Sequence, residues 1–268
     1  MVALTTEFGR FNVYDESNAH LLVNDSSTTH LRGYEGRNYD EHPFGSMPWS
    51  NFPLEIIPRS EWSERIKEGN AKKLFPLHHF RRAKVPILDQ ARTNYCWMNA
   101  VVGCVMSARA RNGFPTVALS SASAAAPGKR YRNQGGWTGE AIKYIQKYGL
   151  APDEMWPNAA IDQRYFQSTR EEAAKYAVAD WWELRPKNFD QVMTCLLNGY
   201  EVCVGLMWWG HAVYYSAPVE IARNAFGVVD VNSWGAGWEN GGMSVLAESK
   251  ATPDEANCIT TVRMDGDR

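Results

Sequence analysis

The sequence lacks the features that would direct it to a membrane or to nucleic acid. None of its apolar runs reaches the length of a transmembrane helix, and residues 1–12 lack the basic and apolar regions of a signal peptide. The net charge is −2, and the Lys and Arg residues form no basic stripe. These absences argue against a membrane or a nucleic acid as the main partner.

Cysteine is scarce, and its spacing predicts no pairing. The five cysteines are an odd number without a C-x-x-C pair: Cys96, Cys104, Cys195, Cys203 and Cys258. This pattern is typical of a reducing compartment rather than of a disulfide framework or a zinc site. We therefore expect no metal and no cofactor, and a location in the cytoplasm or inside a larger assembly.

The chain is long enough and apolar enough to form a sizeable core. It has 268 residues, of which 44% are apolar, so one domain with two subregions or a domain with an extension is expected. Residues 1–75 are rich in turn-forming residues, and prolines alternate with aromatic residues from Pro43 to Pro58. They predict an irregular N-terminal arm with one short helix at 61–68. Such an arm either lies in a groove or on a protein partner, or packs loosely on its own domain.

Residues 76–268 predict an α+β domain. Helical patterns fill its front half, about 76–200, and include a helix over 138–148 that Thr138 can cap. Short β-branched or aromatic segments, separated by Gly, Asn or Pro, fill the back half at 201–268 and predict an antiparallel sheet or barrel. A helical subregion followed by a β subregion implies a cleft between the two.

Cys96 stands at the start of a candidate buried helix. Residues 97–106 are apolar on nearly every face, which is typical of a helix inside a core. The first turn of a helix presents free N–H groups and partial positive charge, so a thiol there is biased toward the thiolate. The alternative is that Cys96 is one more buried cysteine, because free cysteines are commonly buried.

Three polar residues offer the partners that a nucleophilic thiol requires. His211 begins one predicted strand, and Asn232 follows another. The thiol needs a base, and that base needs a group that fixes its tautomer, which an Asn carbonyl oxygen does without adding charge. Gln90 lies six residues before Cys96, where its side-chain N–H can stabilise an oxyanion together with the Cys96 backbone N–H.

With these residues in place, the chain resembles the papain family of cysteine peptidases. Four motifs occur in the family's order: Asp89-Gln90 ahead of Cys96-Trp97, then Asn133-Gln134-Gly135-Gly136, Gly210-His211-Ala212-Val213 and Asn232-Ser233-Trp234-Gly235-Ala236-Gly237-Trp238. The resemblance covers about residues 75–268. It implies a papain-like fold, in which a helical subdomain precedes an antiparallel, barrel-like β subdomain and the site lies in the cleft between them. It also implies a peptide or protein substrate.

By the same resemblance each motif residue takes a role. The implied catalytic residues are Cys96 as the nucleophile, His211 as the general base and acid, Asn232 as the orienter of His211 and Gln90 as the oxyanion donor. The implied substrate-binding residues are Gly135 and Gly136 as the backbone rung for an extended substrate, Trp137 near the pocket for the second side chain before the scissile bond, and Trp238 as the wall on the leaving-group side. Trp234 resembles the shield over Asn232.

The sequence departs from the family beside the nucleophile. Thr93 and Asn133 stand where the family has two cysteines that form a disulfide, which agrees with a reducing compartment. Asn94 and Tyr95 replace Gly and Ser, and the bulk of Tyr95 is expected to narrow the cleft or reshape the oxyanion hole. The arm lacks the long amphipathic helical pattern of the family's inhibitory propeptide, so zymogen processing of the ordinary kind is not expected.

These observations favour a thiol-dependent hydrolase that cleaves peptide amide bonds through an acyl-enzyme on Cys96. One alternative is a papain-like fold that serves as a structural or assembly component of a larger particle, with the 1–75 arm as the contact to a protein partner. Another is a cell-wall peptide amidase. The reactivity of Cys96 separates an enzyme from a scaffold, and the substrate range separates the two enzymes.

Overall fold

The computed structural model describes residues 2–25, 28–43 and 52–263. Its strands are β1 (Val2–Thr6), β2 (Gly9–Tyr14), β3 (Val178–Leu184), β4 (Val202–Leu206), β5 (His211–Ala222), β6 (Ala225–Val231), β7 (Met243–Ala247) and β8 (Glu255–Val262). Its α-helices are α1 (His20–Val23), α2 (Trp62–Ala71), α3 (Pro76–Arg82), α4 (Cys96–Arg111), α5 (Ala122–Gly128), α6 (Thr138–Tyr148), α7 (Phe166–Ala173), α8 (Phe189–Leu197) and α9 (Glu248–Ala251). The predicted α+β class is confirmed.

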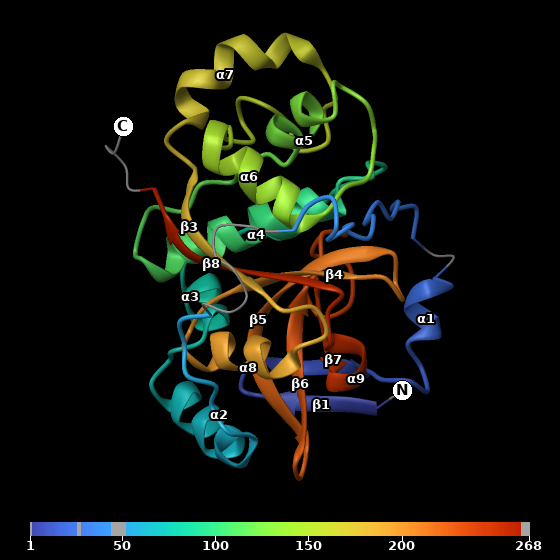
Figure 1. The fold of residues 1–268 in the computed structure, drawn as a ribbon, viewed down its shortest axis with the longest axis vertical. Helices are drawn as coiled ribbons and strands as arrows, with labels where there is room; N and C mark the ends of the chain where they lie inside the picture. The colour runs from blue at the N-terminus through green and yellow to red at the C-terminus, as the bar shows by residue number, and fades with distance from the viewer. Residues whose placement is uncertain (1, 26–27, 44–51, 264–268) are drawn as a thin grey trace.

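All of these strands form one sheet, in the order β1-β2-β7-β6-β5-β4-β8-β3. Neighbouring strands are antiparallel, except that β2 runs parallel to β7. Helices α4 to α7 lie above the strands in Figure 1, whereas α2, α3 and α8 lie beside them lower down. The helical half and the β half therefore meet along α4, as expected for a cleft between the two halves.

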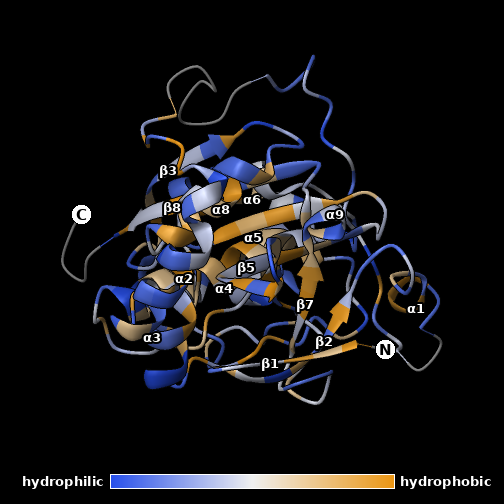
Figure 2. Cartoon of the chain, turned by 90° about the horizontal axis from the view of Figure 1, so that it is seen from below, coloured by the Kyte–Doolittle hydropathy of each residue, from blue (hydrophilic) through white to orange (hydrophobic). Residues whose placement is uncertain are grey.

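The N-terminal residues differ from the irregular arm that we expected. β1 and β2 form a hairpin on the edge of the sheet, and Phe11 and Val13 of β2 are buried. Asn12 between them is half-buried and Tyr14 after them is buried as well, so β2 packs on the core while β1 forms the edge of the sheet. Figure 2 shows β2 beside β7, with hydrophobic residues along both. The arm is therefore part of the domain's sheet at its beginning.

Two further predictions meet the structure differently. The short helix expected at 61–68 is present as α2, which begins at Trp62 and ends at Ala71. β3 lies in the half predicted to be helical, where it pairs with β8 because Trp181 and Val178 face the core. The proline- and aromatic-rich segment expected to lie in a groove includes Phe44, Pro48 and Trp49, which are outside the described residues.

Helix α4 is the centre of the core. All of its residues except the last are buried, which confirms the prediction from its apolar faces. The ring of Tyr214 on β5 lies against Gly103, where a Cβ would come within 2.4 Å of it. This close approach of helix and sheet fixes Cys96, the first residue of α4, against the start of β5.

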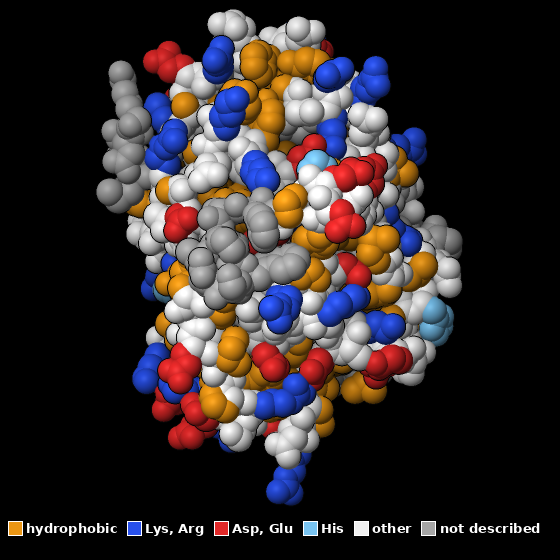
Figure 3. Space-filling view, viewed as in Figure 1, with side chains coloured by type: hydrophobic (Ala, Val, Ile, Leu, Met, Phe, Trp, Pro, Cys, Tyr) orange, Lys and Arg blue, Asp and Glu red, His pale blue; other side chains and the backbone are white. Residues whose placement is uncertain are grey.

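The face of the molecule in Figure 3 carries charged side chains of both signs together with hydrophobic ones. Lys and Arg side chains are interspersed with Asp and Glu over the face seen in Figure 3. Within the described residues, no helix combines the length and the apolar character needed to cross a bilayer.

Candidate active site

Cys96 lies at the first turn of α4 and is fully buried. The backbone N–H of Gly33 donates to its Sγ at 3.3 Å. Burial raises the pKa of the Cys96 thiol to about 11, although backbone N–H groups that include those of Gly33 and Ala212 lower it. The expected bias toward thiolate is therefore wrong for this state, because loss of water around the sulfur outweighs the helix N-terminus.

His211 begins β5, and its Nε2 lies 2.8 Å from Oδ1 of Asn232. The same Oδ1 accepts the backbone N–H of Ser233 at 2.7 Å, which identifies it as the oxygen. Nε2 therefore carries the proton, and Nδ1 is left as an acceptor. Within the described residues Nδ1 is buried and has no hydrogen-bond partner.

The two sides of the cleft meet at these residues. Ala212, whose N–H lowers the pKa of the Cys96 thiol, is the residue after His211. Burial lowers the pKa of His211 to about 3, and the hydrogen bond that His211 donates to Asn232 acts in the opposite direction. Thiol and imidazole are thus both neutral in this state, and the sulfur is bonded to the Gly33 N–H.

Gln90 is buried and held in place by Ser233. Its Oε1 accepts from Ser233 Oγ at 2.7 Å, and its backbone N–H donates to the Ser233 carbonyl. Its Nε2 donates to the carbonyl oxygens of Leu31 at 2.7 Å and Thr93 at 2.9 Å. The donor predicted for an oxyanion is present, and in this state it binds the carbonyl oxygen of Leu31.

Tryptophans enclose the His211 ring. Trp234 lies with its ring centroid 4.8 Å from that of His211, so the two rings are in contact. Trp209 lies at the same distance on another side, and Trp238 packs edge-on against Trp234 at 5.6 Å. Sequence reasoning missed Trp209. The Trp-Trp pair directly before Gly210-His211 was the signal that could have found it.

The segment Leu31–Arg37, which we call the strap, occupies the groove. In Figure 1 the blue chain that follows α1 runs between the upper helices and the strands. The Gly136 N–H donates to the Gly33 carbonyl at 2.9 Å, and the Glu35 N–H donates to the Gly136 carbonyl at 3.0 Å. On the other side, the Tyr34 N–H donates to the Gly210 carbonyl at 3.3 Å. The predicted backbone rung at Gly136 is therefore already paired with the chain itself.

Glycines permit this close contact. A Cβ on Gly33 would lie 2.0 Å from the Asn94 carbonyl oxygen, and one on Gly135 would lie 2.4 Å from the Gly33 carbonyl oxygen. Because the Gly33 carbonyl binds Gly136, the strap presents an N–H to the sulfur rather than a carbonyl carbon. The strap therefore covers the Cys96 thiol with a backbone N–H group.

A buried ion pair anchors the far end of the strap. The Arg37 guanidinium donates to the Glu183 carboxylate, lies 4.0 Å from that of Glu255, and donates to the carbonyl of His42. The His42 ring packs on Trp137, with 4.8 Å between centroids. Trp137, which we expected beside a substrate pocket, is thus covered by the chain that follows the strap.

The residues beside the nucleophile do not crowd the cleft. Tyr95 is fully buried, and its hydroxyl donates to the Arg132 carbonyl at 2.9 Å, so the expected narrowing by its bulk does not occur. Asn133 accepts the Asn94 N–H at 2.6 Å and donates to the Arg92 carbonyl at 3.0 Å. Hydrogen bonds from Asn133 tie the two loops together where the resemblance implies a lost disulfide.

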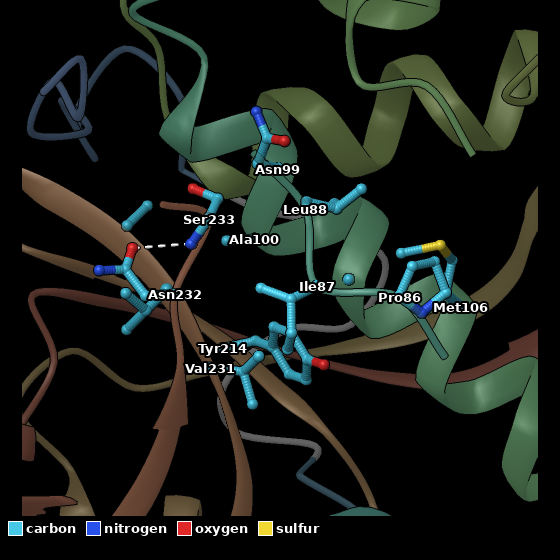
Figure 4. Close-up of a pocket in the computed structure, with 13 residues that line it drawn as sticks. Pro86, Ile87, Leu88, Asn99, Ala100, Met106, Tyr214, Val231, Asn232 and Ser233 are labelled. Atoms are coloured by element: carbon cyan, nitrogen blue, oxygen red, sulfur yellow. Dashed lines mark hydrogen bonds between the residues drawn. The ribbon is translucent and has the colours of Figure 1, made fainter. Parts of the chain in front are cut away.

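A small cavity lies behind the site, between α4 and the strands β5 and β6 (Figure 4). It has room for about one water molecule. Asn232 Nδ2 and Tyr214 Oη are buried without a hydrogen-bond partner within the described residues. Among the residues that the structure describes, no group of His, Cys, Asp or Glu side chains is arranged to hold a metal ion.

Comparison with solved structures places this arrangement in a known architecture. Xylellain, a cysteine protease from Xylella fastidiosa, matches with a TM-score of 0.60 and 16% identity over 87% of this chain and 96% of its own. A structure from work on the mite allergens Blo t 1 and Der p 1 matches with a TM-score of 0.61 and 17% identity over 94% and 85%. A digestive procathepsin L 3 of Tenebrio molitor matches with a TM-score of 0.58 and 16% identity over 69% of this chain and 68% of its own.

The chain has the papain fold. The resemblance that the motifs indicated is confirmed at this level, with the divergence expected from the replaced residues around Cys96. No protein-family model matches the sequence, and no curated protein matches it significantly. In the papain fold the helical and β halves described above enclose the groove that the strap fills.

Proposed function

We propose that the chain is a cysteine peptidase of the papain-like kind, held closed by its own strap. The observation that carries this proposal is that the strap uses the groups a peptide substrate would need. The Leu31 carbonyl accepts a hydrogen bond from Gln90 Nε2, and the Gly33 N–H donates one to the Cys96 sulfur. Tyr34 pairs with the backbone of Gly136. Backbone pairing of this kind is how an extended peptide binds an open backbone edge.

The chemistry follows from the residues once the strap leaves. His211 Nδ1 takes the Cys96 proton, and the sulfur attacks the carbonyl carbon of the scissile amide. The oxyanion accepts from Gln90 Nε2 and the Cys96 N–H. The C–N bond breaks as His211 returns the proton to the leaving amine, and water, activated by His211, then hydrolyses the thioester to release the acid and the thiol.

Two similar structures are described as precursors, the procathepsin of Tenebrio molitor and a ragweed pollen cysteine protease in its proform. Here the blocking segment is tethered at both ends. Upstream, β2 is paired into the sheet, and downstream Trp62 is fully buried. Trimming of the N-terminus would therefore leave the strap in place, and opening requires a cut or a movement within the chain.

Cysteine labelling tests the proposal. Recognition sequences for a site-specific protease, inserted after Asn24 and after Glu41, allow residues 25–41 to be excised from the folded chain. We expect an epoxide thiol reagent to add once to the excised protein, with the adduct on Cys96 by peptide mapping, and we expect the four other buried thiols to stay unmodified. Unreactive Cys96 after excision would favour the assembly component, whereas labelling without peptide cleavage would favour an amidase of another substrate class.

Removing the Arg37 anchor is expected to loosen the strap in the uncut chain. Arg37→Ala deletes charge-assisted hydrogen bonds to a buried carboxylate, each of which contributes about 1.5–3 kcal/mol. The rate of Cys96 labelling should rise at least about tenfold. Arg10→Ala, which removes an exposed arginine on β2, is the matched control and should leave the rate unchanged. Equal rates for both variants would mean that Arg37 does not hold the strap.

A further inference from the structure

Glu239 directly follows Trp238, and the N-terminal hairpin binds both of its carboxylate oxygens. Asn12 Nδ2 donates to Oε2 at 2.6 Å, and the Tyr14 hydroxyl donates to Oε1 at 2.6 Å. Burial raises the pKa of Tyr14, and the hydrogen bond to Glu239 raises it further, so the hydroxyl keeps its proton and is the donor. Hydrogen bonds to an ionised carboxylate are about twice as strong as those between neutral groups. Two such bonds join β2 to the loop that precedes β7.

The backbone of Glu239 is strained. Its φ is +43°, in the left-handed region that residues with a side chain rarely adopt. A conformation of this kind persists only where surrounding contacts hold it, and it is often found at functional sites. The hairpin also reaches the next residue, because a Cβ on Gly9 at the start of β2 would lie 3.1 Å from Asn240 Nδ2. The hairpin therefore holds the loop at two successive residues.

Trp238, the neighbour of Glu239, belongs to the tryptophan cluster around His211. Its ring packs against Trp234 with 5.6 Å between centroids, and its centroid lies 6.4 Å from that of Trp209. Both of these tryptophans contact the His211 ring. Trp238 itself is only half-buried, so the cluster alone does not enclose it. A change in the position of Glu239 would therefore reach the site through Trp238.

We propose that Glu239 is a positioning residue, through which the N-terminal hairpin holds Trp238 in place on the leaving-group side of the site. The hairpin is then a permanent part of the working enzyme, whereas the strap that follows it has to leave the groove. This inference rests on the proposed peptidase function and gives the N-terminal residues a second role in it.

Hydrogen exchange in the uncut chain tests this contact without requiring activity. A double variant, Asn12→Ala with Tyr14→Phe, removes both donors and keeps the aromatic ring of β2. The Trp238 and Gly242 amides donate within the loop, to the carbonyls of Gly235 and Trp238. We expect both amides to exchange at least about tenfold faster in the double variant, because the loop loses its hydrogen bonds to the hairpin.

Tyr215→Phe is the matched control for this measurement. Its hydroxyl is also buried, and it donates to the carbonyl of Ala251 at 2.9 Å, outside the loop. The control should lower the melting temperature without speeding exchange at Trp238 or Gly242. Loop exchange as slow in the double variant as in the control would overturn the proposal, because the loop would then keep its structure without the hairpin.

Two substrates of the excised protein separate positioning from a general loss of structure. They share the residues before the scissile bond, but one ends in an aminocoumarin and the other continues for two amino acids. Native mass spectrometry verifies that residues 1–24 stay bound through the pairing of β2 with β7. We expect the double variant to lose at least about tenfold in kcat/KM on the longer substrate, mainly through KM, and less than about threefold on the aminocoumarin.

The outcomes distinguish this inference from the function on which it rests. Equal losses on the two substrates would overturn the positioning role, because misplacement of Trp238 should affect only a substrate that extends along it. Absence of Cys96-dependent cleavage in the excised wild-type protein would instead remove the proposed function. The exchange measurement in the uncut chain would still decide whether the hairpin holds the loop.

Discussion

Excision of residues 25–41 is expected to raise the rate of peptide hydrolysis at least about a thousandfold over the uncut chain. In the closed state the Cys96 thiol is hydrogen-bonded to Gly33 and the Gln90 side-chain N–H is hydrogen-bonded to Leu31, so no substrate carbonyl can reach either group. An unblocked Cys–His site turns over at about 1 per second or faster, as ordinary enzymes do. A peptide library read by mass spectrometry, with the excised fragment removed by dilution and filtration, measures the change.

The matched controls separate catalysis from contamination and from unfolding. Cys96→Ala, cut in the same way, should show no hydrolysis above background, whereas its melting temperature should change little because a buried thiol gives way to a small methyl. A single cut after Asn24 should activate the enzyme less than both cuts, since the strap then stays tethered near its site. Equal hydrolysis by the Cys96→Ala protein would contradict the assignment of the nucleophile.

Acid is expected to open the strap through His211. Burial, and to a smaller extent the charges of Arg32 and His30, lower the pKa of His211 to about 3 in the closed state. In an open, hydrated site the pKa should return to about 6.5. Below that value the open state binds a proton that the closed state does not. The equilibrium constant for strap opening should therefore increase about tenfold for each unit by which the pH falls, or roughly a hundredfold from pH 6.5 to pH 4.5.

Hydrogen exchange measures this opening without requiring activity. The exchange rate of the Gly33 and Tyr34 amides, corrected for the intrinsic effect of pH, should rise as the pH falls, whereas amides in the middle of β5 should not change. His211→Gln cannot take up the proton, so its strap should open independently of this titration. The same acid dependence in His211→Gln would assign the effect elsewhere, for instance to the carboxylates around Arg37.

The opposite shift of Cys96 acts at the other end of the pH range. The thiol pKa of about 11 in the closed state lies above the ordinary value of about 8.5, so the closed state loses stability as the pH rises from 8.5 toward 11. The strap is thus held most firmly near neutral pH, where both groups are neutral. Alkylation of Cys96 in the uncut chain should accordingly rise with pH up to about 11.

Local patterns in the sequence were enough for the framework of the site. The apolar run after Cys96 predicted a helix buried on all sides, and α4 is such a helix. The Gly-His and Asn-Ser-Trp motifs predicted a His211–Asn232 pair, and the structure brings these side chains to 2.8 Å. Such predictions succeed because hydrophobic periodicity and short motifs depend on residues that are close together in the chain.

The tertiary structure decided what depends on residues far apart. The helix N-terminus favours a thiolate at Cys96, but burial under the strap raises the pKa of the thiol instead of lowering it. No local pattern in Leu31–Arg37 predicts where that segment lies. Likewise Thr138 was expected to cap α6, whereas Glu255, 117 positions later in the chain, binds the helix's first N–H groups. Desolvation and hydrogen bonding across the fold set these properties. The sequence by itself therefore determined the architecture and the candidate catalytic residues, and only the folded chain determined that the strap covers them.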